Sequence, residues 1–481
     1  MSNSTDTPVV EKKKDQIIDL DGVITQFPIR GNKKFIFAMV AAALVFVLVG
    51  FCTDLSAYSP MASKALGGFL ALIIIMMFSD MNLAVNFFCV GLFGLLLGIW
   101  EWKDVTAALG SSSFHQTLGL LIVALGCEYT PLGKRLAYSF LSFLGQKPKT
   151  MIIAFTAACM IFSAFVANAA TVILMASIGN QMLEAMGEKR GESVIGKTMM
   201  GLIMAGAMIG GGMLIGGAPI GNTNMITLLS TASEGRYTVE FSQWGVLGCI
   251  TGFLSIVPVV LVYCKINGVK NSGYKLLPKS YYQEHLKELG RIGGSELRWI
   301  IIAGAMIVAM AVGVPGGKAA IIAGFVCCLP GIGVVPQNEM VKKVPLNSLI
   351  CVCFVGLMAF YITKTGLAQW FCDVLSPVFG LIKSPVVFSI LCAVLMAVGV
   401  STSVNGIVAI QAALFPVMVV VAERMGFNPS VVLQATMFSA SYFWVMGPQS
   451  TNVLCRGFGW WEDRDLLAPG YATICIAAAI D

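Results

Sequence analysis

The feature that most constrains this chain is a set of apolar stretches that are too long and too free of charge for a water-soluble protein. Residues 150–183, 198–233, 384–422 and 425–455 contain no Asp, Glu, Lys or Arg. Only 12% of the 481 residues are charged, whereas soluble domains carry roughly 25%. The sequence therefore predicts an all-α polytopic membrane protein, with several helices that cross the lipid bilayer.

Charged residues divide the first part of the chain into spans. Basic clusters at Lys12–Lys14 and Arg30–Lys34 precede the first apolar run, so the N-terminus is expected in the cytoplasm. Because these early residues are polar, we expect no cleaved signal peptide. Four crossings of about 20 residues each follow, at 35–53, 61–79, 82–100 and 115–130.

The segment Leu132–Gly145 comes next, with a basic start and apolar residues at helical spacing. It is typical of an amphipathic helix in the membrane interface, although an ordinary loop stays open as an alternative.

The four uncharged stretches cannot be single straight helices. A helix rises about 1.5 Å per residue and would overshoot a hydrocarbon core of roughly 30 Å. Two of them, at about 150–184 and 384–422, are predicted to be re-entrant hairpins. The other two, at about 198–233 and 425–455, contain Gly and Pro clusters and are predicted to be broken helices.

The same order of elements occurs twice, which predicts two inverted repeats and about eleven transmembrane helices. Counting spans, the first hairpin enters from the cytoplasm and the second from outside, an arrangement typical of transporters with a site near the bilayer midplane. The predicted divisions are a cytoplasmic tail at 1–34, a first transmembrane helix at 35–60, a first repeat at 61–264, a cytoplasmic linker at 265–298 and a second repeat at 299–481.

Asn168 and Asn405 stand near the middle of the two hairpins and are the leading candidates for contact with a ligand. A hairpin tip leaves backbone N–H groups for an anion and carbonyls for a cation, and an amide side chain offers both kinds of group. Hydrogen bonding between packed helices is the plainer alternative. The other expected substrate contacts are Ala167, Ala169, Thr171, Ser403, Gly406, Pro219, Asn222 and Pro448.

A sodium ion is possible as the coupling ion, and no other cofactor is expected. Because the hairpins and broken helices contain no acidic residue, any cation would be held by neutral oxygens. The candidate sodium ligands are Ser163, Asn168, Gly217, Ser401, Asn405 and Gly447.

Several other functions are disfavoured by the sequence. The phosphate-binding pattern GxxxxGK[ST] does not occur, and the two histidines, His115 and His285, are too far apart to suggest a zinc site. We expect neither an enzyme nor a nucleic-acid-binding protein. An anion channel remains the main alternative, although two different halves fit alternating access better than a pore.

The chain resembles the divalent anion/sodium symporter family, which includes citrate, succinate and tartrate carriers. The resemblance rests on Leu132-Gly133-Lys134-Arg135, on the tip Ala167-Asn168-Ala169 and on the break at Gly216–Asn224. In that family each tip usually reads Ser-Asn-Thr, whereas the second tip here reads Val404-Asn405-Gly406. The asparagines are kept and the flanking hydroxyl groups are lost.

The resemblance implies a secondary transporter of small carboxylate anions, most readily dicarboxylates or tricarboxylates. It also implies a homodimer in the bacterial inner membrane. Sodium symport and anion exchange (antiport) are both consistent with the sequence, and a sulfonate or a monocarboxylate remains possible as the substrate.

Overall fold

The fold was obtained as a computed structural model that describes residues 17–18, 24–25, 33–78, 83–379, 382–402, 407–441 and 454–480. Nearly all of this is helical, and the described strands are one short antiparallel pair, β1 (Ile17–Ile18) and β2 (Ile24–Thr25). The prediction of an all-α membrane protein is confirmed.

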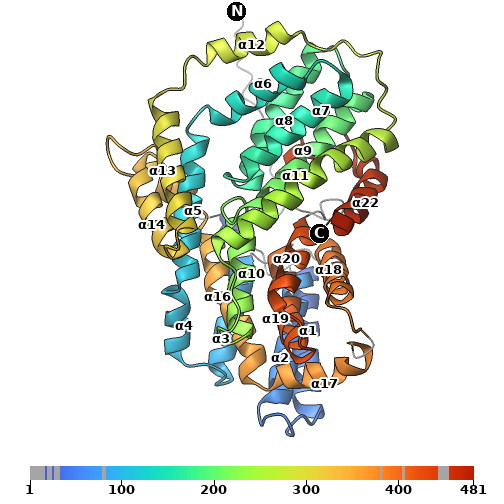
Figure 1. The fold of residues 1–481 in the computed structure, drawn as a ribbon. Coiled ribbons are helices and arrows are strands. Elements are labelled where there is room, and N and C mark those ends of the chain that lie inside the picture. The colour runs from blue at the N-terminus through green and yellow to red at the C-terminus, as the bar shows by residue number, and fades with distance from the viewer. Residues whose placement is uncertain are drawn as a thin grey trace, which may run out of the picture.

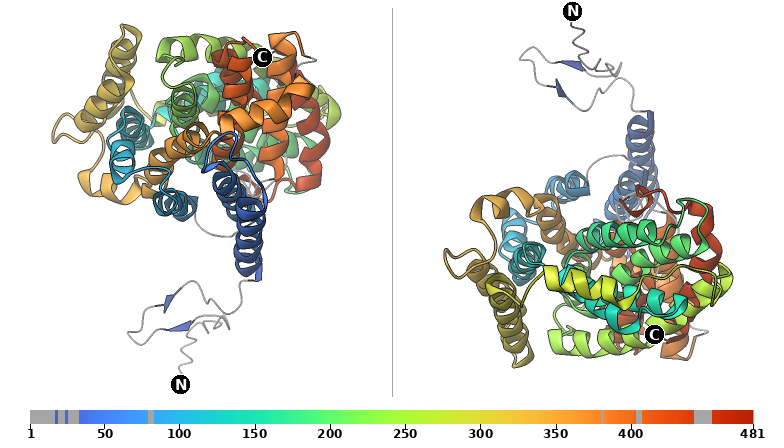
Figure 2. Two further views of the ribbon diagram at one scale, coloured as in Figure 1. Left: turned by 90° about the horizontal axis from the view of Figure 1, so that it is seen from below. Right: turned by 90° about the horizontal axis from the view of Figure 1, so that it is seen from above.

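The first five helices precede the first predicted hairpin. Helix α1 packs along α2 and has much of its apolar surface exposed, as expected for a lipid-facing helix (Figure 2). Helix α5 is capped by Ser111, whose hydroxyl accepts the backbone N–H of Phe114. The bounds are α1 (Lys33–Cys52), α2 (Ala62–Phe78), α3 (Leu83–Leu96), α4 (Trp102–Leu109) and α5 (Ser112–Glu128).

The next six helices contain the first predicted hairpin and broken helix. Pro148 opens α7, where its missing N–H costs no hydrogen bond, and Ser193 caps α9. The chain leaves helical geometry between α7 and α8 and again between α9 and α10. The bounds are α6 (Leu132–Leu144), α7 (Pro148–Ser163), α8 (Asn168–Ala185), α9 (Val194–Met213), α10 (Pro219–Ala232) and α11 (Phe241–Ile266).

The linker region contains a helix that the sequence analysis did not predict. Helix α12 (Lys279–Glu288) packs on α6, and the Tyr282 ring in it is fully buried. Next to it, Arg135 of α6 makes a bidentate ion pair with Glu296, with N–O distances of 2.8 and 3.0 Å. Glu296 lies in the first turn of helix α13 (Gly294–Ala311), which therefore begins inside the predicted linker 265–298.

The remaining helices make up the second half of the chain. Helices α6 and α17 lie at opposite ends of the molecule (Figure 1). The bounds are α14 (Gly316–Cys327), α15 (Gln337–Lys343), α16 (Leu346–Lys364), α17 (Leu367–Phe379), α18 (Pro385–Thr402), α19 (Ile407–Arg424), α20 (Pro429–Ser441) and α22 (Asp463–Ile480).

Among the described residues, five helices are long and apolar enough to cross a membrane alone. A sixth candidate is a helix pair, Leu349–Lys364 with Leu367–Leu375, which bends by 70°. Shorter apolar helices, such as α7, are also present among the described residues. The five single candidates are Phe35–Cys52, Trp102–Glu128, Val194–Met213, Phe241–Ile266 and Gly294–Ala311.

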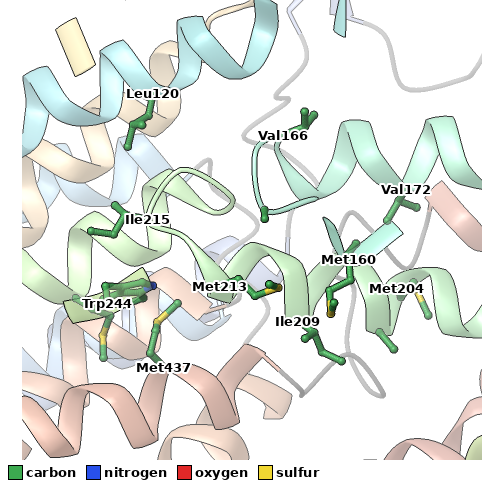
Figure 3. Close-up of a cluster of buried hydrophobic side chains, with 14 of the residues drawn as sticks. Leu120, Met160, Val166, Val172, Met204, Ile209, Met213, Ile215, Trp244 and Met437 are labelled. Atoms are coloured by element: carbon green, nitrogen blue, oxygen red, sulfur yellow. The ribbon is translucent and has the colours of Figure 1, made fainter. Parts of the chain in front are cut away.

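Apolar side chains pack around both breaks of the first half. Val166 lies in the segment between α7 and α8, and Ile215 lies between α9 and α10 (Figure 3). Both side chains are almost fully buried, as is Met213 at the end of α9. This packing holds the non-helical backbone inside the protein, where its polar groups are kept away from lipid.

Candidate functional site

The first break of the chain lies at residues 164–167, between α7 and α8. Its central contact is a 2.9 Å hydrogen bond in which the Ser163 hydroxyl donates to Oδ1 of Asn168. Asn168 is the first residue of α8, so its side chain stands beside the free N–H groups that begin this helix. The Ser163 side chain is fully buried and Asn168 is half-buried.

The amide of Asn168 also faces α9. Its Nδ2 donates to the sulfur of Met208 at 3.3 Å, a weak acceptor that leaves much of the donor capacity unused. Gly211 lies so close that a Cβ there would come within 2.9 Å of Nδ2 and would also clash with Oδ1. Only glycine allows the amide to sit against α9 in this way.

The residues flanking Asn168 have different surroundings. Ala167 and Ala169 are half-buried, whereas Thr171 is fully buried, with its hydroxyl 3.5 Å from the carbonyl oxygen of Val166. The Thr171 hydroxyl therefore points back towards the segment between α7 and α8.

The second break lies at residues 214–218, between α9 and α10. Asn222 braces it, because Nδ2 donates to the carbonyl oxygens of Gly211 and Leu214 at 2.9 Å and lies 3.4 Å from that of Ile215. These are carbonyls that the end of α9 leaves without helical partners. Asn222 is fully buried, and these contacts provide hydrogen-bond acceptors for its amide nitrogen.

The two breaks meet each other. A Cβ on Gly217 would lie 2.5 Å from the carbonyl oxygen of Ser163 and 3.0 Å from that of Gly210, so the two backbones are in direct contact there. Pro219 then opens α10. The ends of α7 and α9 and the starts of α8 and α10 thus converge on one place.

The beginning of α10 also lies beside the second half of the chain. A Cβ on Gly221 would be 3.8 Å from Nε2 of Gln411 and 3.6 Å from the terminal carbon of Met437. Gln411 belongs to the second turn of α19, the helix that follows the second predicted tip.

The other predicted site residues belong to that second half. Ser401 lies in the last turn of α18, Pro385–Thr402. The remaining positions are outside the described residues, namely Ser403, Asn405, Gly406, Gly447 and Pro448.

The electrostatics of the described site come from neutral groups. Neither 150–183 nor 198–233 contains an acidic or basic residue. The starts of α8 and α10 present N–H groups and the positive ends of helix dipoles, whereas Asn168, Ser163 and nearby carbonyls present oxygens. Such a site suits a small anion together with a cation.

The sequence from 33 to 480 matches the sodium:sulfate symporter transmembrane region. The chain belongs to the sodium:sulfate symporter family. This membership confirms the resemblance drawn from the sequence and makes the chain a transport protein of the membrane, not an enzyme.

Two rat proteins match short stretches of this chain. It is 34% identical to the Na(+)/citrate cotransporter of Rattus norvegicus over 91 residues, which is 19% of this chain and 16% of the relative. It is 29% identical to rat solute carrier family 13 member 2 over 96 residues, which is 20% of this chain and 16% of the relative. The matched stretches thus span 16% of either relative's length.

Two solved transporter structures have a similar fold. MtrF of Neisseria gonorrhoeae, from a class of antimetabolite efflux pumps, aligns with a TM-score of 0.57 at 14% identity, covering 81% of this chain and 83% of MtrF. The YdaH transporter of Alcanivorax borkumensis aligns with a TM-score of 0.52 at 14% identity, covering 93% of this chain and 95% of YdaH. At this identity the likeness is one of fold alone.

Sequence reasoning missed Gly211, Met208 and Gln411 as neighbours of the site. The run of glycines around Gly210–Gly212 could have indicated a close backbone approach, since glycine in a membrane helix often marks one. No sequence signal links Gln411 to Gly221, because they lie far apart in the chain and meet only through packing.

Proposed function

We propose that this chain is a secondary active transporter that carries a small carboxylate anion together with Na⁺ by alternating access. The observation that carries the proposal is the contact of Ser163 with Asn168 at the meeting point of four helix ends. Membership of the sodium:sulfate symporter family supports both the anionic cargo and the sodium coupling.

Sodium would be held by uncharged oxygens at the first break. Oδ1 of Asn168 and the hydroxyl of Ser163 are 2.9 Å apart, and the Ser163 carbonyl faces Gly217. Hard cations take such oxygen ligands, and a cation would satisfy carbonyls that helix ends leave without partners. Ser401, Asn405 and Gly447 are the proposed counterparts in the second half.

The anion would be held mainly by N–H donors. The Asn168 amide and the starts of α8 and α10 supply these donors on the first half, with Ala167, Ala169, Thr171, Pro219 and Asn222 around them. Ser403, Asn405, Gly406 and Pro448 are the proposed contacts from the second half. A bound cation would offset the remaining negative charge, since this site has no basic residue.

Dicarboxylates and tricarboxylates are the proposed substrates. The 34% identical stretch of 91 residues shared with a Na(+)/citrate cotransporter favours this class over sulfate.

The proposed topology has about eleven spans in two inverted repeats, with the N-terminus and the linker 265–298 in the cytoplasm. The placement of α6 and α17 at opposite ends of the molecule supports it (Figure 1). The proposed location is the bacterial inner membrane, and the proposed assembly is a homodimer.

Purified protein in liposomes tests the function. Uptake of radiolabelled succinate and citrate should saturate, should require an inward Na⁺ gradient and should be stimulated by unlabelled anion inside the vesicles. Sulfate in place of succinate tests the other substrate class. Flux that needs internal anion but no Na⁺ would replace symport by exchange, and flux that never saturates would indicate a channel.

A further inference from the structure

A second polar feature lies beside the proposed site, between α10 and α19. Asn224 and Gln411 are both fully buried, with no side-chain surface exposed to solvent. Both amide atoms of Asn224 and Oε1 of Gln411 have no hydrogen-bond partner among the described residues. A buried amide without partners is costly, and more so where no water is available.

The two amides stand on facing helices. Asn224 follows Gly221 by three residues and so lies on a neighbouring part of the α10 surface, and Gly221 itself faces Gln411. Near the other end of these helices, Arg236, which follows α10, makes an ion pair of 2.9 Å with Glu423 in the last turn of α19. Helices α10 and α19 therefore run side by side, with the amides near their starts.

Gly221 leaves space beside Nε2 of Gln411. A Cβ built there would meet its nearest neighbours at 3.6 and 3.8 Å, which is ordinary van der Waals contact. A group of about the size of a methyl or a hydroxyl group therefore fits beside Gly221. Among the described residues, the hydrogen bond of Gln411 Nε2 goes to the Met437 sulfur at 3.3 Å, a weak acceptor that leaves donor capacity unused.

We propose that Asn224 and Gln411 bind a hydroxyl group of the transported anion and so determine a preference for hydroxy-carboxylates. A hydroxyl both donates and accepts, and the amide pair has unused atoms of both kinds. A site built to hydrogen-bond a hydroxyl disfavours the analogue without it, because its own polar groups are then left unpaired. This inference rests on the proposed function, since it assigns part of the same substrate.

The test compares L-malate with succinate, which differ by one hydroxyl. Binding to purified protein is measured by calorimetry in saturating Na⁺. The unmodified protein should bind malate roughly 5- to 150-fold more tightly than succinate. Asn224→Ala and Gln411→Ala should remove most of this difference by weakening malate binding.

Gly221→Ala keeps the test informative if the amide variants fold poorly. The added methyl group fits the available space, and alanine favours a helix over glycine, so the thermal stability should be kept or raised. Malate binding should nevertheless weaken towards that of succinate. Gly304→Ala is the matched control, because it changes a helical glycine of α13 whose added Cβ meets nothing within 4 Å. As a second control, Asn86→Ala removes a buried amide of α3 that has no hydrogen-bond partner among the described residues.

The outcomes separate this inference from the proposed function. Equal binding of malate and succinate by the unmodified protein, or a malate preference that survives Gly221→Ala and both amide variants, would overturn the hydroxyl site alone. If neither anion binds, and no other carboxylate is transported, the proposed function fails as well.

Discussion

The Ser163 hydroxyl and Oδ1 of Asn168 are joined by a 2.9 Å hydrogen bond across the break between α7 and α8. This bond connects the last residue of one helix to the first residue of the next. It thereby fixes an amide at a place where both free N–H groups and free carbonyls are available. The predictions below follow from that arrangement and from the contacts that support it.

Ser163→Ala should raise the Na⁺ concentration needed for half-maximal transport. The change removes a hydroxyl oxygen beside Asn168, and a neutral hydrogen-bonding group contributes about 0.5–1.5 kcal/mol, which corresponds to roughly 2- to 12-fold. The Na⁺ dependence of succinate uptake in liposomes measures this. A maximal rate that falls while the Na⁺ dependence stays unchanged would speak against a sodium ligand at this position.

Gly211→Ala should weaken succinate binding through Asn168. The new methyl group would occupy the place of the Asn168 amide, so this side chain must move. Calorimetry on the purified variant measures the loss, and Gly304→Ala serves as the control because its methyl group meets no neighbour within 4 Å. Equal affinity in the two variants would mean that the position of the Asn168 amide does not matter for binding.

Breaking the ion pair between Arg135 and Glu296 should destabilise the protein strongly. The two side chains are only 16% and 2% exposed, and a buried ion that loses its partner costs about 3–5 kcal/mol. Glu296→Gln or Arg135→Ala should therefore lower the thermal unfolding temperature in detergent. Lys103→Ala should not, because the ion pair of Lys103 with Glu101 has both side chains 73% exposed. A similar effect of all three changes would contradict this assignment.

Cysteine labelling tests the topology. Lys275→Cys in the linker should react with a membrane-impermeant reagent only after the cells are opened, whereas Lys103→Cys before α5 should react in intact cells. Both positions are exposed, so accessibility depends on the side of the membrane. Labelling of position 275 in intact cells would invalidate the predicted orientation.

The helical fold could be predicted because its causes are local. Long uncharged runs require membrane helices, and a Gly-Pro cluster such as the one at Gly216–Pro219 cannot continue a straight helix. Helix α12 could not be predicted in this way. Its sequence is polar, and burial of Tyr282 against other elements supports it.

The candidate site was predicted in part for the same reason. Asn168 stands out as a polar residue in an apolar hairpin, and the structure places it at a helix start next to Ser163. The approach of Gly211 to Asn168, and of Gln411 to Gly221, depends on how helices pack across the chain. Periodicity in a single sequence carries no information about such contacts.

The affinity of Asn168→Ala for succinate tests the central claim most directly. Loss of the amide should leave an anion with an unsatisfied group, which costs roughly 1–3 kcal/mol and weakens binding about 5- to 150-fold. Asn168→Asp should bind still more weakly, since a fixed negative charge repels the anion. Ser230→Ala, near the C-terminal end of α10, should bind normally. Unchanged succinate affinity and uptake in Asn168→Ala would show that the first hairpin tip is structural and that the binding site lies elsewhere.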